Sequence, residues 1–450
     1  MKHSMRFTTA LLALGLPLAG CATTTVDDAS GTPSASPSAA GTPAAPAAAG
    51  YDLAPAVVMA GNADHTTVNP DEWDAARAVD VQLSGSGLVG SAAGVSASGS
   101  TVTVDRAGVY RLSGSLTGQL RVAAGEDDLV VLILDGVEID NDAGAAIEVV
   151  SADDVAIELA AGSQNTVSDA ATYAADADAD AAIHSASDLT ISGDGALTVT
   201  GNGNDGITSK DDLVIMGGAI SVTAADDALR GTDALVVEGG TLQLTATAGD
   251  GMSSDGDDDE QGADIDWTRG YILVRGGTIE VTAGDDGLQA FTDTVVAGGS
   301  VTVGVVDDGI KGEVIVSIGQ LDGVDAPTVT VTESQEGLEA ANIGISAGVV
   351  DITGDDDGIN ASGNGELQAR IAGTEYVEQD EMADTGERLE ITGGTVMVVA
   401  GFDGLDSNGS LTISGGSVDI TAVQRGGEGP IDANGGVDVA EGVVTANGSA

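Results

Sequence analysis

Residues 205–226 read DGITSKDDLVIMGGAISVTAAD, and this stretch decides the fold. It holds three short apolar runs, around Ile207, over residues 213–216 and over residues 220–223. Polar residues or the pair Gly217-Gly218 separate these runs. Short apolar runs bounded by Gly, Asn and Asp are typical of β-strands. The stretch therefore predicts three short strands in one unit of about 22 residues.

The unit recurs along most of the chain. Its first aliphatic residue is found at Ile147, Ile183, Ile207, Leu229, Met252, Leu288, Ile310, Leu338, Ile359, Leu405 and Ile431. The double glycine also recurs, as in Gly239-Gly240 and Gly298-Gly299, where a tight corner requires positive φ. A propeller blade requires four strands and about 40 residues, so the unit is too short for one. We predict an all-β solenoid, a parallel β-helix in which each coil contributes three strands.

An acidic residue precedes the glycine at the start of most units. Stacking the coils would align these acids in a column: Asp205, Asp227, Asp250, Asp286, Asp308, Glu336, Asp357, Asp403 and Glu428. A second, broken column precedes it: Asp226, Asp285, Asp307 and Asp356. At a strand spacing of about 4.8 Å and an effective dielectric of about 20, neighbouring charges repel by roughly 3.5 kcal/mol. Some positive charge must offset this repulsion.

Calcium suits these columns because it accepts six to eight oxygen ligands in flexible geometry. We therefore expect Ca²⁺ at the aspartates of both columns. The pattern is broken where Ala228 replaces glycine, at Gln335-Glu336 and at Glu428, and the two glutamates are not assigned as ligands. Soft metals are excluded, since the chain has one cysteine and three histidines. The alternative is a solvated acidic surface built on Asp-Gly turns.

Charge narrows the choice of partners. The chain of 450 residues has 14 Lys+Arg against 72 Asp+Glu, a net charge of -58. Nucleic acids and anionic membrane surfaces require positive charge, so neither is expected as a partner. We expect a monomer.

The N-terminus resembles a lipoprotein signal. A basic start with Lys2 and Arg6 precedes a short apolar run and the sequence Leu-Ala-Gly-Cys ending at Cys21. This pattern predicts a signal peptide over residues 1–20 and lipidation of Cys21, which would anchor the protein to a membrane outside the cytoplasm. Residues 21–50, rich in Ala, Pro, Ser and Thr, predict a flexible tether.

The remaining boundaries follow from composition. Residues 51–82 form an uncertain cap or linker, and residues 83–450 form the β-helix domain. Two insertions, residues 256–270 and 363–388, are expected to be exposed loops.

Several motifs occur in the order found in one known family. The stretches AGVYRLSGSLTGQLRV, LVVLILDGVEI and IELAAGSQNTVSD, followed by the repeated units, resemble the bacterial family of carbohydrate-binding domain-containing proteins. The resemblance extends from about Leu83 to the C-terminus. It implies a right-handed parallel β-helix similar to that of pectate lyases, bound calcium and affinity for plant-type polysaccharides.

Three functions remain open. The first is a lipid-anchored, calcium-dependent module that binds polysaccharide, with an acidic glycan bridged through calcium. Aromatic residues that could stack on sugars are few: Trp267, Tyr271, Phe291, Tyr376 and Phe402. The second is a calcium-dependent polysaccharide lyase of the pectate type, and the third is an acidic structural or adhesive solenoid.

A lyase would require a basic side chain to remove a proton. The residues that follow the buried aliphatics should point outward beside the acids: His184, Thr208, Arg230, Ser253, Gln289, Lys311, Glu339, Asn360, Asp406 and Asp432. Adjacent carboxylates would raise the pKa of Lys311 and weaken it as a base. A lysine held in salt bridges within the acid column is therefore the preferred interpretation, and no catalytic residue is assigned.

Overall fold

The computed structural model describes residues 50–175, 177–256, 262–377, 382–423 and 429–449. Of these described residues 51% are in strands and 5% in helices, and most of the strands belong to one long, largely parallel sheet. The predicted all-β, solenoid-like fold is thereby confirmed. The predicted signal peptide, Cys21 and all but the last residue of the tether lie outside the described residues.

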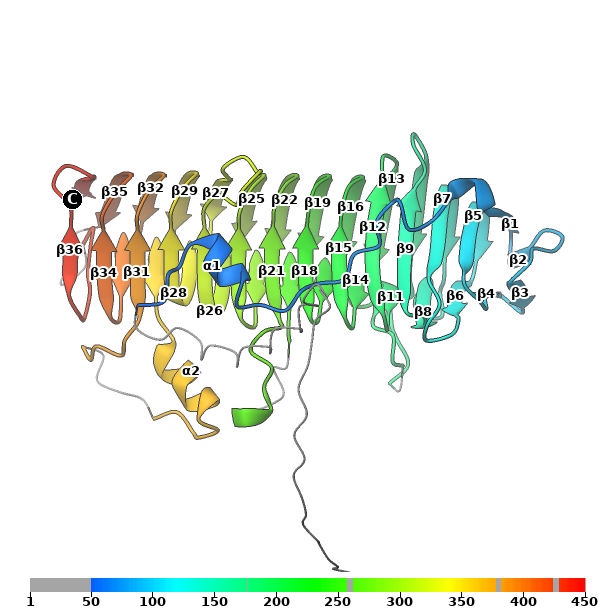
Figure 1. The fold of residues 1–450 in the computed structure, drawn as a ribbon, viewed down its shortest axis with the longest axis horizontal. Coiled ribbons are helices and arrows are strands. Elements are labelled where there is room, and N and C mark those ends of the chain that lie inside the picture. The colour runs from blue at the N-terminus through cyan, green and yellow to red at the C-terminus, as the bar shows by residue number, and fades with distance from the viewer. Residues whose placement is uncertain (1–49, 176, 257–261, 378–381, 424–428, 450) are drawn as a thin grey trace, which may run out of the picture. The chain divides into compact units, whose positions relative to one another are not determined.

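The strands follow one another in three parallel runs. In most of the chain each strand pairs with the third strand after it, so that the chain visits the three runs in turn (Figure 1). The long strands β26 and β28 bend at register shifts or corners and contribute to both the first run and the second.

The first run comprises β4 (Thr101–Val104), β6 (Gln119–Ala123), β8 (Ile147–Ser151), β11 (Ala181–Ser185), β14 (Asp205–Ser209), β17 (Leu229–Gly231), β20 (Met252–Ser254), β23 (Leu288–Ala290), β26 (Ile310–Ile318), β28 (Leu338–Ile345), β30 (Ile359–Ala361) and β33 (Leu405–Ser407). The second run comprises β1 (Val79–Ser84), β5 (Gly108–Thr117), β7 (Val130–Asp140), β9 (Asp154–Leu159), β12 (Asp188–Gly193), β15 (Asp212–Ile215), β18 (Ala234–Val237), β21 (Tyr271–Val274), β24 (Asp293–Val296), the second halves of β26 and β28, β31 (Arg388–Ile391), β34 (Ser410–Ile413) and β36 (Val437–Val439). The third run comprises the end of β7, β10 (Gln164–Ser168), β13 (Ala196–Gly201), β16 (Ala219–Ala224), β19 (Thr241–Ala246), β22 (Thr278–Ala283), β25 (Ser300–Val305), β27 (Thr328–Glu333), β29 (Val349–Gly354), β32 (Thr395–Ala400), β35 (Ser417–Val423) and β37 (Val444–Ser449). The short strands β2 (Gly87–Leu88) and β3 (Val95–Ser98) pair antiparallel with β1 and β4.

The aliphatic residues that open the units stack as predicted. Ile207, Leu229, Met252, Leu288 and Ile310 are successive Cα partners in the first run. The partner series also includes the predicted residues on both sides, from Ile147 to Ile431. The sequence spacing of these residues therefore sets the register of the whole run.

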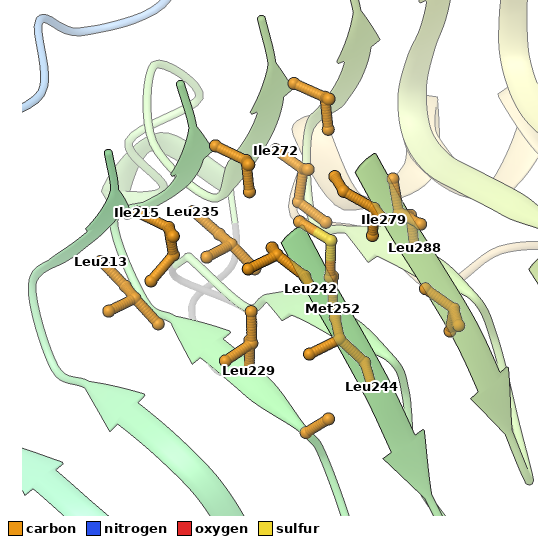
Figure 2. Packing of buried hydrophobic residues seen from close by; sticks show 14 of the residues in the cluster. Leu213, Ile215, Leu229, Leu235, Leu242, Leu244, Met252, Ile272, Ile279 and Leu288 are labelled. Carbon is orange, nitrogen blue, oxygen red and sulfur yellow. The ribbon is translucent and has the colours of Figure 1, made fainter. Parts of the chain in front are cut away.

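The interior is filled by one layer of aliphatic side chains from each run. Figure 2 shows Leu229 and Met252 of the first run, Leu235 of the second and Leu242 of the third converging on a common core, and all of these side chains are buried. In the third run inward and outward residues alternate, as β16 illustrates. Small aliphatics fit this interior because three short strands enclose little space.

Glycine occupies two kinds of corner for different reasons. At the double-glycine corners the second glycine has positive φ, as at Gly240 (98°), which confirms the predicted turn. At the acidic corners the reason is close approach: a Cβ on Gly287 would lie 2.3 Å from the carbonyl oxygen of Gly309 in the next coil.

Residues 51–77, here named the strap, run across the outer face of the second run (Figure 1). The strap contains the helix α1 (Pro55–Met59) and the 3₁₀ helix η1 (Ala75–Arg77). It begins beside β31, where Arg388 donates to the carbonyl of Tyr51 at 2.9 Å. Ser317 likewise donates to the carbonyl of Leu53 at 2.6 Å. The strap explains why β15, β18 and β24 are buried on both faces.

The expectation of exposed loops holds for the two insertions only in part: residues 372–377 are exposed, but other described residues pack against the strands. The insertion after β30 forms α2 (Asn364–Ile371), whose Leu367 is buried, and the insertion after β20 forms the 3₁₀ helix η2 (Gly262–Asp264), followed by the buried Ile265. An apolar cluster on the outer face of the second run collects Leu367 and Leu53. In the described part of the chain no helix has the length and apolar character needed to span a membrane.

Candidate functional site: the column of carboxylates

The predicted acid column exists, and most of its carboxylates are tied to the coil that follows. Asp227 accepts a hydrogen bond from the backbone N–H of Asp250 (2.8 Å), Asp250 accepts one from Asp286 (2.9 Å), and Asp286 accepts one from Asp308 (2.8 Å). Asp205 and Asp357 bond in the same way to the next acid in the column. One carboxylate oxygen therefore satisfies a corner amide, which gives the acid a structural role that the repeat alone did not reveal.

Burial makes these carboxylates hard to ionise. Asp205, Asp250 and Asp286 are buried, and burial raises the pKa of Asp250 to about 8, with Asp227 and Asp286 adding to the effect. Burial likewise raises the pKa of Asp205 to about 7 and that of Asp286 to about 6. The expected repulsion is thus relieved partly by proton uptake.

Arg230 neutralises the first part of the column. Its guanidinium lies 2.7 Å from Asp205 and 3.2 Å from both Asp180 and Asp255, with Asp227 at 4.0 Å. The side chain is only 20% exposed. Burial alone would lower its pKa, but these four carboxylates raise it above the usual value.

Lys311 neutralises a second part. Its ammonium lies 2.7 Å from both Asp308 and Glu339 and 4.0 Å from Asp286. Burial opposes its charge, yet Glu339 and Asp308 raise the pKa of Lys311. The predicted salt-bridged lysine is therefore present.

The residues that follow the buried aliphatics form a second column in register with the first. In the strand register, Arg230 is the Cα partner of Ser253, Gln289 that of Lys311, and Lys311 that of Glu339. Not all of them are open to solvent as expected, because His184, Thr208 and Ser253 are buried. His184, for example, bonds to Asp180 at 2.9 Å.

Three groups of acids bring a ligand atom of each member within 4.8 Å of the others: Asp285, Asp286 and Asp307; Asp308, Glu336 and Glu339; Asp403, Asp406 and Asp432. The sequence prediction contained all members of the first group. It missed Glu336, Glu339, Asp406 and Asp432 as ligands, although these residues stand in the two adjacent columns. Combining both columns would have found them.

The groups differ in how well they suit a divalent cation. All offer only carboxylate oxygens, which favours Ca²⁺. The group at Asp308 does not fit, because the Lys311 ammonium already lies between Asp308 and Glu339. The group at Asp403 fits: burial raises the pKa of Asp406 to about 7, and Asp357, Asp403 and Asp432 raise it further. The exposed Asp285 and Asp307 fit as well.

The other predicted ligands fall outside such groups. In the described ranges Asp226, Asp356 and Asp357 belong to no group of three acids, and Asp205, Asp227 and Asp250 serve the corner amides. Glu428 lies outside the described residues.

The aromatic candidates also separate. Tyr271 and Phe291 are buried, and Trp267 stacks on Phe291 with ring centroids 5.4 Å apart. Arg370 of α2 lies over the Phe291 ring at 4.6 Å. Tyr376 and Phe402 remain exposed, at 42% and 50%. Phe402 directly precedes the acid group at Asp403.

The structure is thus an acidic, repetitive, solenoid-like scaffold with stacked carboxylates at its corners. A family model for carbohydrate-binding domain-containing proteins matches residues 98–375. A carbohydrate-binding domain-containing protein of Acetivibrio thermocellus is 37% identical over 232 residues, which is 50% of this chain and 78% of that protein. The polysaccharide lyase-like protein from C. thermocellum, solved as a gadolinium derivative, is 30% identical, with a TM-score of 0.47 over 58% of this chain and 96% of that one. The chain belongs to the family of carbohydrate-binding domain-containing proteins, as its motifs indicated.

Proposed function

We propose that this chain is a calcium-dependent polysaccharide-binding module, held at the cell envelope by lipid on Cys21. Family membership supports carbohydrate as the ligand class. The observation that carries the calcium dependence is the group of Asp403, Asp406 and Asp432, whose ligand atoms lie within 4.8 Å of one another. The exposed Phe402 directly precedes Asp403 in the sequence.

The ligand class follows from the same group. Asp403, Asp406 and Asp432 would hold the ion, which would supply positive charge to the carboxylates of an acidic glycan. The Phe402 ring offers a flat apolar surface for a sugar ring. A protein with a net charge of -58 repels a free polyanion, so a polyuronate requires such a bridge.

A finer description of the fold belongs to this proposal. We expect a right-handed helix with coils of about 22 residues, because parallel strands joined by a crossover in one sheet are right-handed in nearly all proteins. The partner pairs Ile207–Leu229 and Leu288–Ile310 support this coil length.

Binding is favoured over lyase activity by the state of Lys311. A lysine that removes a proton must first lose its own, and Glu339 and Asp308 raise the pKa of Lys311 and keep it charged. Arg230 is held charged in the same way by Asp205 and Asp255.

The test is retention of the protein on immobilised polygalacturonate, first with calcium and then with a chelator at equal ionic strength. We expect retention only with calcium and no release of unsaturated sugar, measured by ultraviolet absorbance. Equal retention in both conditions would refute calcium dependence, and release of unsaturated product would establish the lyase.

A further inference from the structure

The strap carries one of the chain's two tryptophans onto the first coils. Trp73 packs on an apolar cluster formed on the outer face of β7 and β9 by Val131, Ile133 and Ala156. It lies before residue 98, where the match to the family model begins. Trp73 is therefore an addition of this chain to the part that the family model describes.

The ring of Trp73 is only partly buried. It also lacks the kinds of interaction that hold Trp267 and Tyr271 in place. Trp267 is stacked on Phe291, and the hydroxyl of the buried Tyr271 donates to the carbonyl of Ala63 at 3.0 Å. Trp73 takes part in none of the hydrogen bonds or ring stacks found among the described residues. Its partly exposed indole can therefore accept a ligand.

Two cavities share Trp73 and Asp74 in their walls. One, of about 360 Å³, borders β5 and β7 and contains Arg77 and Arg106. The other, of about 550 Å³, borders the ends of β9 and β12 and contains Glu158 and Asp194. Trp73 thus stands between two hollows that lie over successive coils, an arrangement suited to an extended ligand.

The polar groups of these cavities favour a neutral ligand. The carboxylates of Glu72, Asp74, Glu158 and Asp194 outnumber the guanidinium groups of Arg77 and Arg106 by two. An anionic chain would be repelled, whereas sugar hydroxyls can donate to the carboxylates, and the guanidinium groups can donate to sugar oxygens.

We propose that Trp73 and the two cavities form a calcium-independent subsite for a neutral oligosaccharide, whose central ring stacks on the indole. The proposal rests on the proposed function only in taking carbohydrate as the ligand. It uses none of the acid groups at Asp285, Asp308 or Asp403.

The two tryptophans permit a direct test. In the Trp267→Phe variant all tryptophan emission comes from Trp73, and phenylalanine keeps a ring against Phe291. The protein is titrated in chelator with neutral hexasaccharides of glucose, xylose or mannose, and with hexagalacturonate as the anionic comparison. We expect a saturating change in emission with at least one neutral hexasaccharide and none with hexagalacturonate.

Substitutions at Trp73 then assign the effect to the ring, measured by calorimetry in the otherwise natural sequence. Trp73→Leu, which keeps apolar contact with Val131, should weaken binding at least tenfold, whereas Trp73→Tyr should stay within about fivefold. Tyr376→Ala, which removes another exposed aromatic, should leave the affinity unchanged.

Failure here and failure of the calcium-dependent function are distinguishable. No response to any neutral hexasaccharide, or equal affinity in Trp73→Leu, would overturn this subsite even if retention on polygalacturonate with calcium persists. A response to hexagalacturonate alone would overturn the choice of a neutral ligand.

Discussion

Replacing Arg230 with methionine removes the cation that offsets the start of the acid column. Methionine keeps much of the apolar stem but leaves Asp205, Asp180 and Asp255 without the guanidinium that lies within 3.2 Å of each. Asp205 is fully buried. Removing one partner of a buried ion pair costs about 3–5 kcal/mol in the free energy of unfolding. We expect the lower end, about 3 kcal/mol, because Asp205 can take up a proton when its partner is lost.

The pH dependence of this loss gives the sharper test. With Arg230 present, the pKa of Asp205 is about 7 and that of Asp227 about 6, both raised mainly by burial. Without the cation both values rise further, so near pH 5 both groups are neutral and the penalty shrinks. Urea unfolding followed by circular dichroism, in chelator at pH 7.5 and at pH 5, measures the loss of unfolding free energy at each pH.

Arg269→Met is the matched control. Arg269 pairs with Asp233 and Asp266, but its side chain is 47% exposed, so we expect a loss of at most about 1 kcal/mol at either pH. A loss below about 1 kcal/mol for Arg230→Met, or an equal loss at both pH values, would refute the role given to burial and charge in the column.

Three further predictions concern the same corners. Without calcium, the free energy of unfolding should fall as pH rises from about 5 to about 8. The reason is that carboxyl groups with raised pKa values, such as Asp250, still bind protons in the folded state at pH values where the unfolded chain has lost them. A flat or rising profile would contradict this prediction. Lys311→Met should add one calcium ion to the stoichiometry measured by calorimetry, because it removes the ammonium from among the carboxylates of Asp308, Glu336 and Glu339. An unchanged calcium count would show that the lysine does not take the place of a metal ion. Gly287→Ala should lower the free energy of unfolding by about 2 kcal/mol or more, because the new Cβ would lie 2.3 Å from a carbonyl oxygen. The control Ala228→Gly, in the equivalent corner, should lower it by at most about 1 kcal/mol. Similar thermal unfolding of both variants would refute the close-approach argument.

Much of the fold could be predicted because the repeat expresses one physical requirement many times. Each coil needs an inward aliphatic residue such as Leu229, and each double-glycine corner needs positive φ, as at Gly240. Register follows from the spacing of such residues, since a stacked strand has few alternatives.

The strap could not be predicted because it has no repeat. Its contacts come from a few scattered residues such as Leu53 and Val58, which pack on strands more than 100 residues away in sequence. The helix α2 was missed for a similar reason, because Leu367 is its only fully buried residue.

The candidate site was predicted in part. Columns of acids were evident in the sequence. It could not show, however, that one carboxylate oxygen of Asp227 and of Asp250 accepts a hydrogen bond from a backbone amide of the next coil. Nor could it show which acids lie within reach of one ion, since that depends on side-chain direction. The proximity of Asp406 and Asp432 to Asp403 is evident only from the three-dimensional structure.

The most direct measurement of the central claim compares two double variants for retention on polygalacturonate at saturating calcium. Asp403→Asn with Asp406→Asn removes two of the three acids of the group of Asp403, Asp406 and Asp432. Asp419→Asn with Asp438→Asn removes the same charge from exposed positions on β35 and β36. We predict that the first variant loses calcium-dependent retention and that the second binds like the natural protein. Full retention by the first variant, or equal loss in both, would contradict a calcium-dependent binding site at Asp403, Asp406 and Asp432.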